Sequence, residues 1–296
     1  MTSLSKLSTP LLITGGLAAI AYAGTCLALY NYQTKLIFRP LPLILHTPAE
    51  AGMAYEDIWI PLPNASQKLH GWWMPHPKSQ RTLLLCHGNY GNISYNINRC
   101  HFYHSLGFSV LSFDYRGYGL SQKDIPSEQK AYEDAEAALH YLTSIRRISA
   151  NTITALGHSL GGAIATNLAA HHPELNSLVV ESSFTSMKDA VHAKKIYRLF
   201  PIEQLLSYPF DSLSKVKDLK VPVFYVHGDL DTDVPSIFSH QLYEASPAPK
   251  AIWISKGAGH NNITTDFKEN YREAISEFLS QTEPIQAAQQ TKAEVS

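Results

Sequence analysis

The sequence feature that most constrains this fold is the run NTITALGHSLGGAIA, from Asn151 to Ala165. It contains a G-x-S-x-G pattern at positions 157–161, with Ser159 at its centre. The β-branched residues before the pattern predict a short strand, and the alanine-rich residues after it predict a helix. In such a strand, sharp turn and helix, the serine has a strained backbone and an exposed hydroxyl. The flanking glycines leave no Cβ where strand and helix pass close together.

Strand-like and helical runs alternate on both sides of this turn, which predicts an α/β fold with a mostly parallel sheet. Predicted strands cover residues 55–62, 68–74, 81–86, 108–113, 152–156, 177–180, 221–226 and 250–254, the first two as an antiparallel pair. Predicted helices cover residues 95–106, 128–145, 162–170 and 267–279. A chain of 296 residues with 45% hydrophobic content can bury one sizeable core, so one catalytic domain is expected.

The N-terminal region contains an apolar run without charged side chains, residues 11–30. Because a bilayer span needs about 20 apolar residues, a single transmembrane anchor is predicted. A cleaved signal peptide and a lipoprotein signal ending at Cys26 are the alternatives, and the continuation of the apolar run past Cys26 favours the anchor. The free N-terminal amine and Lys6 on one side roughly balance Lys35 and Arg39 on the other, so the charges leave the orientation open.

The predicted organisation has five parts. They are an N-terminal flank (1–10), the anchor (11–30), a connector (31–54), the main α/β domain (55–280) and a disordered polar tail (281–296). Within the domain, the helix–strand alternation loosens over residues 185–220, where basic and apolar residues interleave. This segment is predicted to form a small cap over the site. It is either an apolar lid that receives an acyl chain near the membrane or ordinary amphipathic helix packing.

Charge and cysteine content limit the partners. The net charge of −1 provides no basic field, so nucleic acid is not an expected partner. The three cysteines, Cys26, Cys86 and Cys100, have neither a paired framework nor a metal-binding spacing. Cys86 ends an apolar strand, where a buried thiol is expected.

A serine nucleophile needs a base to take its proton and an acid to orient that base. His260 is the predicted base because it lies between glycine-rich turn residues after the last predicted strand. Asp229, Asp231 and Asp233 share the preceding loop, so spacing alone does not choose the acid. The position of Asp231 at the apex of the loop favours it, and Glu181 is an outside candidate.

The run HGNYGN at residues 87–92 follows a predicted buried strand. Backbone N–H groups in such a turn can face an oxyanion that develops beside the serine. The N–H groups of Asn89 and of Leu160, the residue after the serine, are therefore the predicted oxyanion hole.

Three other chemically active side chains are predicted to be structural. His87 is expected to bond backbone and shape its turn. Asp114 and Arg116 are expected to brace the following glycine turn, either by an ion pair or by backbone hydrogen bonds.

Ser159, Asp231 and His260, with their surroundings, resemble the α/β-hydrolase superfamily, most closely its membrane-anchored α/β-hydrolase-domain proteins. The likeness includes QTKLIFRP from Gln33, HGN from His87, DYRGYG from Asp114, GHSLGG from Gly157, HGxxDxxVP from His227 and the pair His260-Asn261. The motif at His227 selects Asp231 over its neighbours. The resemblance implies hydrolysis of an ester or thioester through an acyl-enzyme, without metal or organic cofactor. It also favours a catalytic domain outside the cytoplasm.

The resemblance does not fix the substrate, because related proteins act on lipids, acylated proteins and small esters, and some resemble peptidases. An acyl or lipid-like ester is the expected substrate, and a peptidase stays open. Dehalogenases and epoxide hydrolases normally have an aspartate at the elbow, where this chain has Ser159. A non-catalytic membrane-anchored binding protein would be expected to lack a triad member, and all three residues are present.

Overall fold

The computed structural model describes residues 4–63, 66–247 and 249–293. At its centre is an eight-stranded sheet with the order β10-β9-β8-β7-β4-β6-β3-β2. The strands are β2 (Glu56–Pro61), β3 (Lys68–Met74), β4 (Arg81–Cys86), β6 (Phe108–Phe113), β7 (Ile153–His158), β8 (Ser177–Glu181), β9 (Val223–Gly228) and β10 (Lys250–Ser255). In the order of the sheet, the neighbouring strands β10, β9, β8, β7, β4 and β6 all pair in parallel. Strand β3 is antiparallel to both β6 and β2. The predicted sheet is confirmed.

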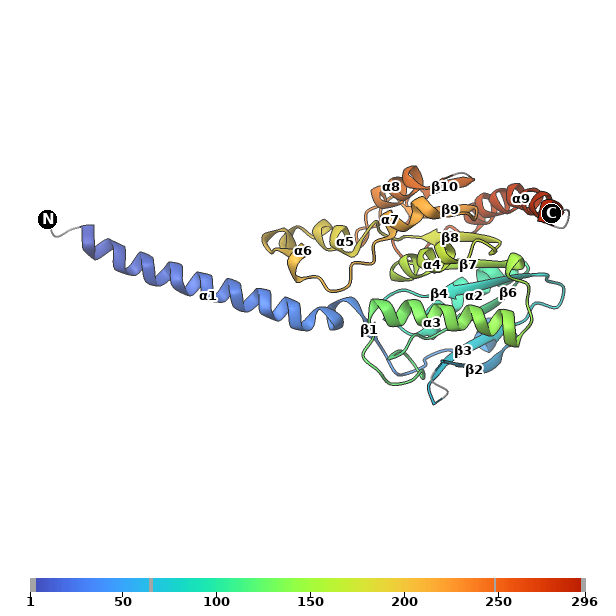
Figure 1. Cartoon of the computed structure of the whole chain (residues 1–296), viewed down its shortest axis with the longest axis horizontal. Coiled ribbons are helices and arrows are strands. Elements are labelled where there is room, and N and C mark those ends of the chain that lie inside the picture. Colours follow the sequence, from blue (N-terminus) through green and yellow to red (C-terminus); the bar gives the residue numbers. More distant parts are fainter. Residues whose placement is uncertain (1–3, 64–65, 248, 294–296) are drawn as a thin grey trace.

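Helices cover both faces of this sheet (Figure 1). The longer ones are α2 (Ile97–Ser105), α3 (Glu128–His140), α4 (Leu160–His171), α8 (Ile237–Ala245) and α9 (Lys268–Ala293). Successive side chains of a strand point to opposite faces. Accordingly, Leu84 and Cys86 join the core cluster with α3 and α4, whereas Leu83 and Leu85 join the cluster with α2 and α9.

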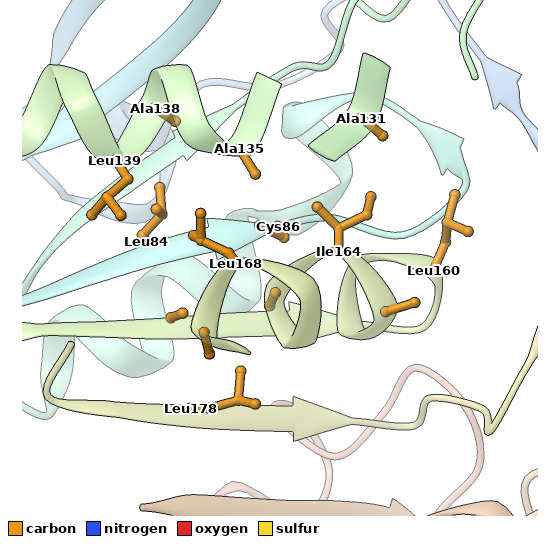
Figure 2. Packing of buried hydrophobic residues seen from close by; sticks show 14 of the residues in the cluster. Leu84, Cys86, Ala131, Ala135, Ala138, Leu139, Leu160, Ile164, Leu168 and Leu178 are labelled. Carbon is orange, nitrogen blue, oxygen red and sulfur yellow. The ribbon is translucent and has the colours of Figure 1, made fainter. Parts of the chain in front are cut away.

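Small residues let α3 pack closely in the first cluster. Figure 2 shows Ala131, Ala135 and Ala138 on the side of α3 that faces β4 and α4. All three alanines are buried. Cys86 on β4 is buried as well, and burial raises the pKa of its thiol to about 12, so this cysteine is an unreactive core residue.

The N-terminal helix α1 (Leu4–Ile37) projects away from the sheet (Figure 1). Its part Ile13–Ile37 is long and apolar enough to be a candidate membrane span. The helix extends past the predicted anchor at both ends. It is followed by β1 (Arg39–Pro40), which pairs in parallel with β5 (Tyr90–Gly91) in a separate two-stranded sheet.

Short helices fill the segment between β8 and β9, where the alternation of the sequence loosens. They are α5 (Met187–Ala193), η5 (Lys195–Leu199), α6 (Ile202–Leu205), α7 (Ser212–Lys215) and η6 (Val216–Asp218). We call residues 187–206 the cap segment. In Figure 1, α5 and α6 extend from the sheet on the side where α1 leaves it.

The C-terminal segment differs from the predicted disordered tail, because α9 continues through Gln281 to Ala293. Alanine, glutamine, glutamate and lysine are favourable in helices, and they dominate this segment. Polar composition alone therefore did not distinguish a helical extension from a disordered tail.

Candidate active site

Ser159 lies at the junction of β7 and α4 with φ 55° and ψ −120°, the strained conformation expected from its turn. A Cβ on Gly157 would lie 2.1 Å from the carbonyl oxygen of Gly161, so the strand and helix do approach closely. The backbone of Ser159 is fixed on both sides. Its N–H donates to the carbonyl of Glu181 at 2.9 Å, and its carbonyl accepts from Ser183 Oγ at 2.8 Å.

Asp231 and His260 come from loops after β9 and β10 and meet at the same edge of the sheet. His260 Nδ1 donates to Asp231 Oδ2 at 2.6 Å. The other carboxylate oxygen accepts the N–H groups of Asp233 at 2.9 Å and Val234 at 2.8 Å. Burial opposes ionisation of this carboxyl group, but hydrogen bonds from His227 and His260 outweigh it and hold the Asp231 pKa well below its usual range. Asp231 is therefore an anion that orients the imidazole.

His227 supports Asp231, a role that sequence reasoning did not assign. It is fully buried, and its Nε2–H is shared between two acceptors, the carbonyl oxygen of Val234 at 2.8 Å and Asp231 Oδ2 at 3.2 Å. Its Nδ1 is 2.7 Å from Ser239 Oγ. The position of His227 at the start of the HGxxDxxVP motif was the available signal.

His158 holds the backbone of the loop that contains His260, a role that sequence reasoning also did not assign. Its Nε2 donates to the carbonyl of His260 at 3.0 Å, and the two rings are 5.0 Å apart. Burial, with the charge of Arg99, lowers the His158 pKa well below its usual value. The side chain therefore stays neutral and keeps one ring N–H for this bond.

The other acid candidates are engaged elsewhere. Asp229 Oδ1 accepts the N–H of Gly257 at 2.7 Å, and Asp233 lies at the surface near Lys194. Glu181 is buried and accepts bonds from three side chains: Arg99 Nε at 2.6 Å, Tyr103 OH at 3.1 Å and Tyr271 OH at 2.7 Å. Among the described residues, Asp231 is the carboxylate that reaches His260.

The loop that contains Asn89 packs against the serine turn. A Cβ on Gly88 would lie 3.5 Å from the Cβ of Ser159. Leu160 is the first residue of α4, and the first N–H groups of a helix have no intrahelical acceptor. Asn89 and Leu160 both line the pocket that contains Ser159 and His260.

His87, Asp114 and Arg116 lie in the core around this loop. His87 Nδ1 donates to the carbonyl of Gly88 at 2.7 Å, and Asp114 Oδ1 accepts the N–H of Ile93 at 2.8 Å. Arg116 binds Asp134 of α3 at 2.6 Å. The glycine turn is therefore braced by backbone bonds and by the ion pair of Arg116 with Asp134 of α3.

The pocket has a volume of about 870 Å³ and lies between α1, the cap segment and the loops that contain Ser159 and His260. Its α1 wall consists of Leu29, Gln33, Leu36 and Ile37. Sequence reasoning placed Leu29 in the anchor and the other three residues in the connector, and it gave neither segment a part in the site. Because the helix is apolar on every side, its sequence does not indicate which face contacts the domain. Its part in the site is therefore visible only in the tertiary structure.

Comparison with known proteins agrees with this fold. Residues 81–211 match the family model for the alpha/beta hydrolase fold. An uncharacterized protein of Mycobacterium tuberculosis is 32% identical over 270 residues, covering 90% of this chain and 94% of the relative. An uncharacterized membrane protein of Saccharomyces cerevisiae is 28% identical over 278 residues, covering 90% and 94%. The chain belongs to the α/β-hydrolase family.

A solved structure shows the same fold. The esterase PF2001 of Pyrococcus furiosus aligns with a TM-score of 0.69 and 22% identity, covering 83% of this chain and 98% of the esterase. At this identity the likeness supports the architecture of the domain rather than a shared substrate.

Proposed function

We propose that this protein is a serine hydrolase that cleaves carboxylic esters or thioesters through an acyl-enzyme. The observation that carries the proposal is the hydrogen bond from His260 Nδ1 to Asp231 Oδ2, at the pocket that contains Ser159. This bond leaves His260 Nε2 as the ring nitrogen for the serine proton. The strained backbone of Ser159 is the second supporting feature.

In the proposed reaction, Ser159 Oγ attacks the carbonyl carbon while His260 Nε2 takes its proton. The oxygen of the tetrahedral intermediate accepts hydrogen bonds from the N–H groups of Asn89 and Leu160. The bond to the leaving oxygen or sulfur then breaks, and His260 returns the proton to it. Water attacks the acyl-enzyme with His260 as the base, which releases the acid and restores Ser159. Asp231 stabilises the imidazolium of His260 during both acylation and deacylation.

The test is labelling of the full-length protein with a fluorophosphonate, followed by hydrolysis of p-nitrophenyl esters and of an aminoacyl nitroanilide. We expect labelling and ester hydrolysis in the native protein and in Ser144→Ala, a serine substitution in the short π-helix that follows α3. Ser159→Ala should lose both. Labelling that survives in Ser159→Ala would contradict the assignment, and preferential cleavage of the nitroanilide would replace the esterase by a peptidase.

We also infer that α1 anchors the protein in a membrane as a single pass. The apolar length of Ile13–Ile37 supports this, as does the name of the yeast relative, an uncharacterized membrane protein. The resemblance to membrane-anchored hydrolases favours a catalytic domain outside the cytoplasm. Protease protection in right-side-out vesicles tests it: digestion of the domain without lysis supports this side, and protection until lysis contradicts it.

A further inference from the structure

The cap segment is fastened along one face of α1. Tyr22 OH donates to the carbonyl of Leu199 at 3.0 Å, and the ring of Tyr22 stacks on Phe200 with centroids 5.5 Å apart. Further along the helix, Gln33 Nε2 donates to the carbonyl of Leu205 at 3.0 Å. Tyr22 and Gln33 are separated by about 16 Å of helix. The contacts therefore run from Tyr22 to Gln33, in the part of the candidate span nearer the sheet, and the rest of α1 projects beyond the cap segment (Figure 1).

These contacts determine how deep the cap segment would lie in a bilayer. If residues 11–30 cross the hydrocarbon, Tyr22 lies about 12 Å inside the boundary at Tyr30, at 1.5 Å per residue. Leu199 and Phe200 contact Tyr22, so they would lie at a similar depth.

The outer surface of the cap segment suits such a position. Ile196 and Leu199 are 61% and 65% exposed, although both are large and apolar. Lys195 and Arg198 are exposed in the same short helix. Apolar side chains beside basic ones are typical of segments that insert into the boundary between lipid headgroups and acyl chains.

The pocket has two chemically different walls. Leu29 and Leu36 of α1 face the site together with Ile202 and Leu206 of the cap segment. A second group of lining residues, Asn96, Arg99 and Thr264, is polar. Most of the apolar lining belongs to α1 and the cap segment, which also contribute Gln33 and Lys194, whereas the polar group belongs to the rest of the domain. An amphipathic substrate would find matching surroundings at both of its ends.

We infer that the pocket takes a membrane lipid ester directly from the bilayer. The cap segment lies in the lipid beside α1, the acyl chain enters between them, and the polar wall holds the headgroup while Ser159 attacks the ester. The inference rests on the proposed function of Ser159 and on α1 spanning the membrane.

The position of the cap segment can be measured without activity. In proteins carrying Cys26→Ser, a nitrobenzoxadiazole label is attached to Ile196→Cys or to Ile145→Cys. Ile145 is 51% exposed and follows α3, so it serves as a matched control. In phosphatidylcholine vesicles with nitroxide-labelled lipids, the label at position 196 should lose more than about half of its fluorescence, as an inserted residue would. The label at position 145 should lose almost none.

Equal, weak quenching at both positions would overturn the inference. Fluorophosphonate labelling of the same samples reports on Ser159 separately. If the fluorophosphonate reacts but the fluorophore at position 196 is not quenched, lipid insertion is refuted and the hydrolase proposal stands. If that fluorophore is quenched but the fluorophosphonate does not react, the hydrolase proposal is refuted.

The acyl route is tested by narrowing the α1 wall. Leu36→Trp adds bulk to the pocket at a residue that is 52% exposed, so folding should survive. We expect the ratio of kcat/KM for p-nitrophenyl palmitate to that for the butyrate to fall about tenfold. Leu43→Trp, an exposed leucine outside the pocket lining, should keep the ratio. An unchanged ratio in Leu36→Trp would contradict a chain path along α1.

Discussion

The side-chain amide of Asn89 donates a hydrogen bond to the backbone carbonyl of Ile37 across 2.8 Å. This bond joins the loop proposed to stabilise the oxyanion to the last residue of α1. The N–H of Arg39 donates to the carbonyl of Asn89 at 2.8 Å, and Tyr118 OH donates to the same carbonyl at 2.9 Å. The position of the Asn89 loop therefore depends on where the N-terminal helix ends.

Asn89→Asp tests this dependence. The carboxylate cannot donate to the Ile37 carbonyl, so the loop should shift and weaken one oxyanion donor. We expect kcat for p-nitrophenyl butyrate to fall by about 10- to 100-fold with a small change in KM. Asn98→Asp places the same charge elsewhere on the pocket wall. Equal losses in the two variants would attribute the effect to charge instead of to the lost hydrogen bond.

Asp231→Asn should lower kcat/KM for esters by about 10³- to 10⁴-fold, because a neutral amide neither fixes the His260 tautomer nor stabilises its cation. Asp229→Asn is the matched control. Its amide oxygen can still accept the Gly257 N–H, so its loss should be far smaller. Steady-state kinetics of both variants decides the acid, and a larger loss in Asp229→Asn would reverse the assignment.

His172 should make stability depend on pH. A hydrogen bond to Glu136 at 2.7 Å, and one to Glu174 at 2.8 Å, raise its pKa to about 9 despite partial burial. Because the unfolded histidine titrates near about 6.5, the stabilisation is complete below that pH and is lost as pH rises through 9.

His172→Gln should therefore lower the free energy of unfolding by about 1 kcal/mol at pH near 6 and by little at pH near 10. Urea denaturation at the two pH values measures the difference. A similar loss at both would show that packing, and not charge, is responsible.

Gly161→Ala should destabilise the domain by more than about 2 kcal/mol. Its Cβ would lie 2.0 Å from the carbonyl oxygen of Cys86, so β4 and α4 must separate. Gly16→Ala in α1 is the control, because nothing lies within 4 Å of the added methyl group. Thermal unfolding of both variants checks the expectation, which fails if their midpoints agree.

Local pattern was enough to predict the strands and the turn at Ser159. A buried strand such as β4 is a continuous apolar run, and the turn requires glycines at fixed positions. The sequence order also placed His260 and the aspartate loop after late strands. Selecting Asp231 needed the family motif, because spacing treats the three aspartates of that loop alike.

Contacts between distant segments could not be predicted in this way. The partner of Arg116 is Asp134, which is 18 positions away on α3, and nothing in local spacing singles it out. The part of the pocket wall that α1 contributes could not be predicted for the same reason. An apolar helix gives one sequence signal whether it faces only lipid or also a protein cavity.

Because α1 forms part of the pocket wall, removing this helix would change the pocket. A shortened chain that begins at Phe38 would keep Ser159, Asp231 and His260, yet it would lack Leu29, Gln33, Leu36 and Ile37. It would also lack the carbonyl that Asn89 binds. Such a soluble form would have a wider, wetter entrance and a loosened loop, so its substrate preference would describe a different enzyme from the full-length one.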